Sequence, residues 1–249
     1  MNTTGKSLKV MLIALTMSLS GCAVVPPDSG SNPSDPWETF NRQTHAFNGE
    51  LDRLFLRPIA QSYVDYVPDG VRHSVSNAFA NVGEPGNMLN NWLQGKWSEG
   101  FVSGARFLIN STVGVLGLFD VASHINLDRS EEDFGQTLAT WGIDSGAYVV
   151  WPLFGPSTVR DTVGSAVDTV TSPMFYVLND QKDGWKIAYK GVQTVDWRSQ
   201  ILPADALLNS ALDPYVAVRD AYISNRINLI YDGNPPMLLL KDEFEDEEL

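Results

Sequence analysis

Cysteine and histidine are both scarce in this chain. Cys22 is its single cysteine, so an intrachain disulfide and a thiolate metal site are excluded. Its three histidines (His45, His73 and His124) lie far apart and lack the HExxH spacing of a zinc site. We therefore expect no metal and no cofactor, and we interpret each histidine as a surface or capped side chain.

Catalytic motifs are lacking too. The nearest approach to a nucleophile elbow is GKWSEG at residues 95–100, whose GxxSxG spacing differs from GxSxG and favours a turn before a helix. No glycine-rich stretch has the spacing of a phosphate-binding loop. The sequence thus predicts that the protein is not an enzyme, although folding can gather carboxylates in ways that a sequence does not reveal.

Positive charge is also in short supply. The chain holds 17 Lys and Arg against 30 Asp and Glu, a formal net charge of −13. Without residues 1–21, which contain Lys6 and Lys9 but no acid, the net charge becomes −15. So acidic a chain has no broad basic surface for nucleic acid or anionic lipid headgroups, and we expect no nucleic-acid partner.

Long apolar runs are absent after residue 21. An uncharged, mainly apolar stretch spans residues 107–119, which is shorter than the roughly 20 residues needed to cross a bilayer. We therefore predict no spanning helix. Residues 107–119 are expected either to lie in the plane of a membrane or to form a buried core helix.

The N-terminus has the pattern of a lipoprotein signal. Lys6 and Lys9 precede an apolar run over residues 10–19, and LSGC at residues 19–22 closes it. We predict cleavage before Cys22 and acylation of its thiol and new amine; the alternative is an ordinary secretory signal with a chance cysteine. Acyl chains contribute about 0.8 kcal/mol per buried CH₂. An aspartate directly after the cysteine would favour retention in the inner membrane, but this chain has Ala23 there. The expected location is therefore the outer membrane, facing the periplasm.

Composition divides the chain into four segments. Residues 1–21 are the predicted signal peptide, and residues 22–34 are an acylated cysteine with a flexible tether rich in Pro, Ser and Gly. One domain is predicted over residues 35–240. Residues 241–249, with six acids, are predicted to be a disordered tail.

Helix signals recur through this domain, whereas strand-like sequence is confined to pieces such as residues 147–151. DPWE at residues 35–38 predicts a capping box with Asp35 as N-cap. Asp213 is predicted to begin a helix that reaches about Tyr231, and Ser172 another. Residues 67–70 separate two helices, and a helix with a GxxxG-like pair begins near Ser98. The sequence therefore predicts a mainly helical domain.

The remaining features suit a protein that handles an amphiphile. Residues 107–119 and 148–154 are apolar enough to embed in a leaflet, with Trp141 and Trp151 as interface anchors. Arginine can pair bidentately with phosphate, and two Arg-Asp pairs punctuate apolar neighbourhoods at 160–161 and 219–220. The alternatives are that the apolar segments form a core and that the pairs are surface ion pairs.

A series of motifs resembles one family. DPWETFNR at residues 35–42 resembles the DPxExFNR opening of the MlaA (VacJ) lipoprotein family. Further blocks follow in the family's order at residues 57–60, 66–68, 84–85, 90–95, 106–112, 134–138, 141–142, 155–161, 213–215 and 219–222. An ordered series across residues 35–222 is far more specific than any single motif.

The resemblance implies an all-α fold, a single ring-like helical domain that lies in the membrane leaflet, with an N-terminal lipid anchor and short irregular connectors. It implies an outer-membrane lipoprotein that removes mislocalised phospholipid from the outer leaflet. The phospholipid would pass through a polar channel to a periplasmic phospholipid-binding carrier, beside a trimeric outer-membrane porin. The alternatives are a structural porin-associated lipoprotein without transport activity and, more remotely, an enzyme that acts on envelope lipid.

Candidate residues follow for each part of such a mechanism. We expect lipidation at Cys22, and a gating hairpin at about residues 44–49, where a simple helix-to-helix bend is the alternative. The candidates for lining or bracing the channel are Arg160, Asp161, Arg219 and Asp220; those for the hairpin are Ala46, Phe47, Asn48 and Gly49; those for membrane embedding are Phe107, Leu108, Leu116, Leu118, Phe119 and Trp151.

Overall fold

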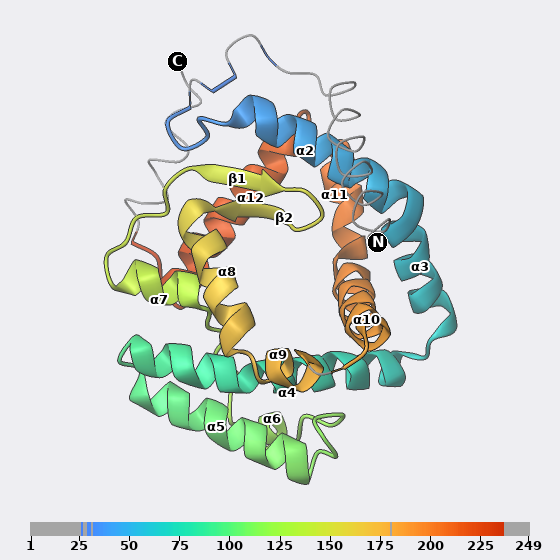
Figure 1. Cartoon of the computed structure of the whole chain (residues 1–249), viewed down its shortest axis with the longest axis vertical. Helices are drawn as coiled ribbons and strands as arrows, with labels where there is room; N and C mark the ends of the chain where they lie inside the picture. The colour runs from blue at the N-terminus through green and yellow to red at the C-terminus, as the bar shows by residue number, and fades with distance from the viewer. Residues whose placement is uncertain (1–25, 27–28, 31, 180, 237–249) are drawn as a thin grey trace, which may run out of the picture.

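The helices of this protein are arranged in a ring around a central gap in the ribbon (Figure 1). The computed structural model describes residues 26, 29–30, 32–179 and 181–236. The predicted signal peptide, Cys22 and the acidic tail lie outside the described residues. Within them the chain is helical apart from a two-stranded sheet, which confirms the all-α prediction.

The helices and strands are joined by short connectors. In chain order they are α2 (Glu38–Leu51), the π-helical turn η2 (Asp52–Leu56), α3 (Arg57–Tyr66), α4 (Asp69–Leu93), α5 (Trp97–Thr112), α6 (Val121–His124), α7 (Phe134–Thr140), β1 (Tyr148–Trp151), β2 (Gly155–Thr158), α8 (Val159–Thr171), α9 (Pro173–Asn179), α10 (Asp183–Ile201), the 3₁₀ turn η3 (Leu202–Ala204), α11 (Asp205–Ser210) and α12 (Pro214–Ile230).

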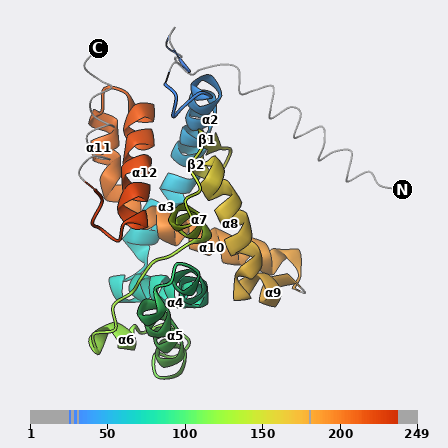
Figure 2. The same cartoon turned by 90° about the vertical axis from the view of Figure 1, so that its left-hand side faces the viewer.

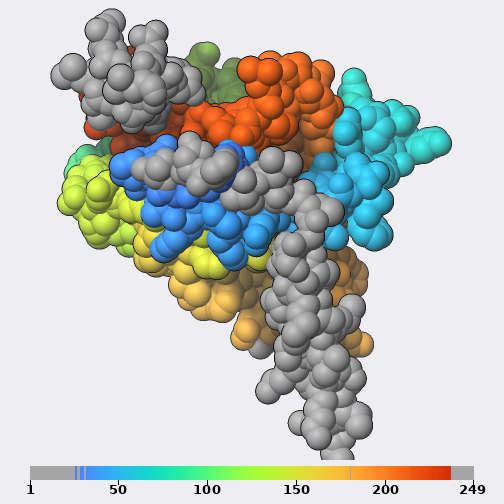
Figure 3. Space-filling view, turned by 90° about the horizontal axis from the view of Figure 1, so that it is seen from above, coloured from blue at the N-terminus to red at the C-terminus, as the bar shows by residue number. Residues whose placement is uncertain are grey.

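The ring is built from segments that are far apart in the sequence. In Figure 1, α2 and α3 form its upper and right rim, α4 crosses below the gap, and α7, α8 and the sheet form the left side. Helix α10 forms the inner right side, and α5 packs under α4. Turned by 90°, α9 lies at one face of the ring and α11 and α12 lie at the other (Figure 2). Seen from above, α2 lies beside the C-terminal helices (Figure 3).

Several predicted helix starts are confirmed. The Asp213 carboxylate caps α12 by accepting hydrogen bonds from the backbone N–H groups of Tyr215 at 2.9 Å and Val216 at 3.3 Å. Helix α9 begins at Pro173, directly after Ser172. Helix α5 begins one residue before Ser98, and a break at residues 67–68 separates α3 from α4. These starts depend on local capping and proline geometry, which a sequence displays directly.

The predicted capping box at Asp35 is wrong. Helix α2 begins at Glu38, and Trp37 occupies the N-cap position without a side-chain cap. The fully buried Asp35 carboxylate instead accepts hydrogen bonds from Asn41 Nδ2, at 2.7 Å, and from the Tyr215 hydroxyl. A tertiary contact with α12 has replaced the local cap.

The predicted hairpin at residues 44–49 is also wrong. These residues lie in the last turns of α2, which continues through η2 into α3 without a break. Gly49 has a free face, since nothing lies within 4 Å of the position a Cβ would occupy. It is therefore an ordinary helical glycine, and the chain curves here through a π-helical turn rather than reversing.

Residues 107–119 are a helix end followed by a tight turn, not one helix. Helix α5 ends at Thr112, and the Gly117 N–H then returns to donate to the Asn110 carbonyl at 2.7 Å. Val115 adopts a positive φ of 53°, which is unusual for a β-branched residue. Glycine is required at 114, where a Cβ would lie 2.9 Å from Asn110 Cα.

The small sheet anchors an apolar cluster inside the upper part of the ring. Strands β1 and β2 pair antiparallel, with Tyr148 opposite Thr158 and Trp151 opposite Gly155. Tyr148 and Val150 of β1 pack with Tyr215 of α12 in a buried cluster. The β1 prediction is thus confirmed, whereas β2 (GPST) gave no strand signal because it lacks the β-branched alternation of a half-buried strand.

We expect Gly164→Ala to destabilise the ring where α8 crosses α7. A Cβ at Gly164 would lie 2.8 Å from Gly135 Cα, so a methyl group there would overpack the crossing. The expected loss is about 1–3 kcal/mol of unfolding free energy, measured by chemical denaturation in detergent.

The matched control is Gly191→Ala in α10, where a new Cβ meets nothing within 4 Å. This change should leave stability unchanged or raise it by about 0.5–1 kcal/mol, because alanine is the better helix former. Equal stability of the two variants would contradict the close approach of α7 and α8.

Candidate functional site

The distribution of polarity in this protein is inverted. Soluble proteins bury apolar side chains and keep most charged ones exposed. Here the fully buried large side chains include those of Arg106, Glu84, Asn41, Asn90 and Asn91. The buried apolar residues of the described part are Ala60, Ala122, Leu138, Tyr148, Val149, Val150 and Tyr215.

The inversion is clearest where α4 packs on α5. The buried residues are spaced by three or four and so share one face of each helix. They are Asn81, Glu84, Asn87, Asn90 and Asn91 on α4, and Gly100, Ser103, Arg106 and Asn110 on α5. Large apolar side chains of both helices, such as Leu93 and Phe101, are exposed. Small and polar residues at a helix interface are typical of helices that pack in lipid.

Arg106 is the centre of this interface. Its guanidinium donates from Nε to Glu84 Oε1 at 2.8 Å and from Nη2 to the Asp120 carboxylate at 3.0 Å. The Arg106 and Glu84 side chains are only 2% and 1% exposed. Burial alone would raise the pKa of Asp120, but hydrogen bonds from Ser123, Asn110 and Arg106 outweigh it and lower that pKa. One arginine thus ties α5 to α4 and to the start of α6.

Arg160 and Asp161, two predicted channel residues, are buried in one charge cluster. Asp161 accepts from Arg160 Nε at 3.1 Å, from Arg226 Nη2 at 3.1 Å and from the Tyr222 hydroxyl at 2.8 Å. Arg226 also pairs with Asp133. The Arg160 and Asp161 side chains are largely hidden, so they brace α8 against α12.

Arg219 and Asp220 belong to a second charge cluster, which lies about two turns before Arg226 on α12. Arg219 Nε donates to Asp220 Oδ1 at 2.8 Å, and its Nη1 lies 3.5 Å from the buried Asp35 carboxylate. The Asp220 side chain is 48% exposed. The structure therefore places each predicted arginine in an internal ion pair, and α12 links the two clusters. A role in binding headgroups stays a prediction.

A third charge cluster was not predicted from the sequence. Arg198 of α10 donates from Nε to Asp52 at 2.7 Å and from Nη2 to Asp205 at 2.9 Å, and so joins η2 to α11. Nearby, the buried Asp196 accepts from Ser76 of α4. One sequence signal could have revealed this cluster. Polar residues recur every three or four positions in helices whose other face is apolar.

The exterior is correspondingly apolar. Of the predicted embedding residues, Leu108, Leu116, Leu118, Phe119 and Trp151 are exposed, and Phe107 is half-buried. Leu153 and Phe154, between the two strands, are exposed as well. Apolar surface of this extent marks a site of membrane or protein contact. No helix of the described residues is long and apolar enough to cross a bilayer.

Of the predicted gating residues, Asn48 contacts the turn between the two strands. The Asn48 side chain donates from Nδ2 to the Trp151 carbonyl at 2.9 Å and accepts from the Leu153 N–H at 2.8 Å. Ala46 and Phe47 are half-buried on the same helix. Two hydrogen bonds thus hold this part of α2 to the β1–β2 turn.

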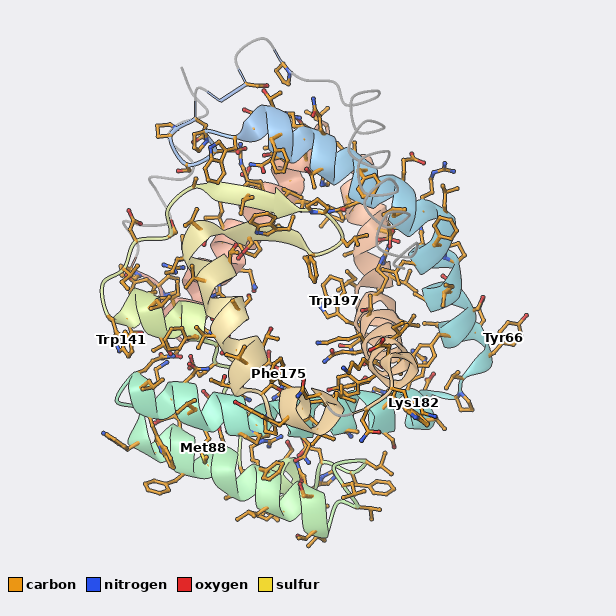
Figure 4. All side chains as sticks on the ribbon, viewed as in Figure 1. Tyr66, Met88, Trp141, Phe175, Lys182 and Trp197 are labelled. Atoms are coloured by element: carbon orange, nitrogen blue, oxygen red, sulfur yellow. The ribbon has the colours of Figure 1, made fainter. Side chains whose placement is uncertain are left out.

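One aromatic side chain points into the middle of the ring. Figure 4 shows Trp197 of α10 directed toward the central gap, with Phe175 at its lower edge, while Tyr66 and Trp141 point outward. The histidines lie elsewhere. His45 packs edge-on against Tyr215, and His124 Nδ1 lies 2.9 Å from the Asp120 carbonyl. The described residues contain no acid, histidine or cysteine group suited to a metal.

Comparisons with known proteins agree with these features. Residues 33–228 match the family model described as MlaA lipoprotein. The intermembrane phospholipid transport system lipoprotein MlaA of Escherichia coli (strain K12) is 36% identical over 252 residues, which cover 96% of this chain and 98% of that protein. Its counterpart from Haemophilus influenzae is 34% identical over 234 residues, covering 90% and 92%. A solved structure, described as the structural basis for maintenance of bacterial outer membrane lipid asymmetry, matches with a TM-score of 0.69 and 37% identity, over 79% of this chain and 99% of that one.

We expect Glu84→Ala to destabilise the protein strongly, because it leaves the buried Arg106 without its closest carboxylate. Breaking a buried ion pair from one side costs about 3–5 kcal/mol, to be measured as unfolding free energy in detergent. The control is Glu50→Ala, which removes an exposed pair with Arg53 and should change stability little. Similar losses in both variants would show that burial of the Arg106 pair is unimportant.

Acid should destabilise the ring through Asp133. Burial raises the pKa of this carboxyl, but hydrogen bonds and charge from Arg226 outweigh it, so the pKa lies below its ordinary value. A lowered pKa in the folded state stabilises the protein above the unfolded value of about 4, and this contribution is lost as the pH falls through the folded value. We expect unfolding free energy to fall below about pH 4, and less steeply in Asp133→Asn; identical slopes would contradict the assignment.

Proposed function

Because the chain belongs to the MlaA lipoprotein family, we propose that it maintains the lipid asymmetry of an outer membrane by retrograde phospholipid transport. In this proposal it removes mislocalised phospholipid from the outer leaflet and passes it through the middle of the ring to a periplasmic carrier. Nothing in this function requires a bond to be broken, so we propose no enzymatic activity.

The inverted polarity of the ring is the observation that supports this proposal most directly. Exposed Leu116 and Phe119 of the turn after α5 and Phe154 of the β1–β2 turn would be poorly solvated in water. In the acyl region of a leaflet the same surface is well solvated, and the polar groups inside the ring remain hydrogen-bonded to one another. We therefore propose that the ring lies in the leaflet rather than on it.

The charge clusters suggest how a headgroup could cross. An unpaired charge in hydrocarbon is costly, so a headgroup needs a polar route while its acyl chains remain in apolar surroundings. We propose that Arg160, Asp161 and Arg219 brace the wall of this route, since each is held in an ion pair, and that the half-exposed Asp220 faces it. Trp197, which points into the gap, would narrow the route (Figure 4).

A gate in α2 must act through the β1–β2 turn. If residues Ala46, Phe47, Asn48 and Gly49 move to admit lipid, the two hydrogen bonds from Asn48 to the Trp151 carbonyl and the Leu153 N–H must break. We propose that α2 and the β1–β2 turn form this gate together, as a helix that shifts rather than a hairpin that opens.

Location and partners complete the proposal. Acylation of Cys22 would anchor the chain to the periplasmic face of the outer membrane, since several acyl chains on one residue anchor a protein stably. We propose a trimeric outer-membrane porin as the neighbour and a periplasmic phospholipid-binding protein as the recipient. The exposed apolar rim of the ring supports the first, because such a surface also suits contact with a barrel embedded in the same leaflet.

The test uses cells of the source bacterium in which the gene is deleted and then complemented. Phospholipid in the outer leaflet is quantified by labelling with an externally added phospholipase. We expect exposure to rise several-fold on deletion, the wild-type chain to restore it, and Cys22→Ala to fail. Unchanged exposure on deletion would contradict transport and favour a structural, porin-associated lipoprotein.

A further inference from the structure

A row of lysines begins α10. Lys186 and Lys190 are spaced by four residues and therefore share one face of α10, and Lys182 precedes the helix as its N-cap residue. The part of the chain that the structure describes holds one other lysine, Lys96, which pairs with Glu132 and Asp232. In a chain with a formal net charge of −13, this row is a local concentration of positive charge.

This charge is weakly neutralised by comparison with the arginines of the ring. Lys186 Nζ lies 3.8 Å from Asp183, whose side chain is almost fully exposed. Lys190 Nζ lies 3.3 Å from Gln193 Oε1 and 6.0 Å from the centre of the Tyr189 ring. Arg106, Arg160 and Arg198 each contact a carboxylate within 3.1 Å. The Lys186 and Lys190 ammonium groups are thus available to an anion.

The same lysines border an apolar pocket. It measures about 310 Å³ and lies between α4, α8, α9 and α10, with Lys186 and Lys190 among its lining residues. The apolar lining comes from Phe79, Val82, Met174, Phe175 and Leu178. Phe79 and Tyr189 meet edge to face, with ring centres 5.4 Å apart, and close one wall. This volume is at the lower end of the range for ligand pockets, about 300–1,000 Å³.

The pocket adjoins the proposed route. Gln193 lines it, and Trp197 lies one turn further along the same face of α10, where it points into the middle of the ring (Figure 4). Phe175 of α9, which also lines the pocket, lies at the lower edge of the central gap in the same figure. The pocket and the side chain that points into the middle of the ring thus share one face of α10.

We propose that this pocket holds one acyl chain of a phospholipid while Lys186 and Lys190 bind its phosphate. The proposal rests on the proposed function for the identity of the ligand. An apolar slot of this size fits a single chain better than a whole lipid, and lysine binds phosphate as a point charge on a flexible stem. The acidic chain otherwise repels an anionic phosphate, so this lysine pair gives the phosphate a preferred position beside the route.

Site-specific photocrosslinking in cells tests the pocket. Phe175 is replaced by p-benzoylphenylalanine, a photoreactive residue of similar shape, in the full-length chain of cells grown with ³²P-phosphate. The same replacement at Tyr176, an exposed neighbour that does not line the pocket, reports ordinary contact with surface lipid. After irradiation, the adduct on each purified chain is counted and identified by mass spectrometry.

Charge variants separate the pocket from the surface. We expect Lys186→Gln with Lys190→Gln to lower the glycerophospholipid adduct at position 175 about fivefold and to leave that at 176 unchanged. Lys182→Gln, which changes the third lysine of the row outside the pocket lining, should alter neither. Circular dichroism of each purified variant checks that its helices are intact.

The outcomes distinguish the pocket from the proposed function. An unchanged adduct at position 175 in the double variant, or an adduct of lipid A instead of glycerophospholipid, would overturn the pocket. If the chain restores lipid asymmetry in the deletion strain but gives no adduct at 175, the pocket fails and the transport function stands. If deletion leaves asymmetry unchanged, the transport function itself fails.

Discussion

The buried guanidinium of Arg106, held between Glu84 and Asp120, illustrates the constraint on which the ring depends. In water, the hydrophobic effect decides which face of a helix turns inward. In a leaflet it cannot, because acyl chains are as apolar as a protein core. Polar contacts must then choose the inward face. The leaflet location that we propose would thus explain why the asparagine-rich face of α4 and the Gly100 and Arg106 face of α5 turn toward each other.

The apolar core is correspondingly small and local. Tyr148 and Val150 pack with Tyr215 where the sheet meets α12, and the two charge clusters of Asp35 and Asp161 lie next to them. Each cluster joins a C-terminal helix to a segment far earlier in the sequence. A ring closes only through such long-range contacts, so buried polar groups, rather than a central apolar core, hold its two ends together. A buried ion pair is weak evidence for net stability, and in some proteins such pairs contribute specificity instead, which is what the closure of a ring requires.

Local chemistry determined what could be predicted from the sequence. The starts of α9 and α12 depend on proline and an aspartate cap within a few residues, and both were predicted correctly. Asp35 carries the same cap signal but is used by Asn41 and Tyr215, the latter 180 residues away. The turn after α5 needs Val115 at a positive φ, which no propensity suggests. The buried polar faces of α4 and α5 could not be predicted in this way, because in water the apolar face of a helix is the one expected to turn inward.

The charge distribution of the ring suits a protein that passes phospholipid on better than one that holds it. Its arginines are neutralised by neighbouring carboxylates, as with Arg226 between Asp133 and Asp161, so the wall that we propose would offer a passing headgroup polarity without a strong fixed charge. Conduction requires sites that bind well enough to admit a ligand and weakly enough to release it. A wall of unpaired arginines would bind phosphate too tightly to release it. Two flexible lysines beside an apolar slot give the weaker contact that a lipid in transit needs, because ammonium groups stay hydrated and hold phosphate without a rigid fork.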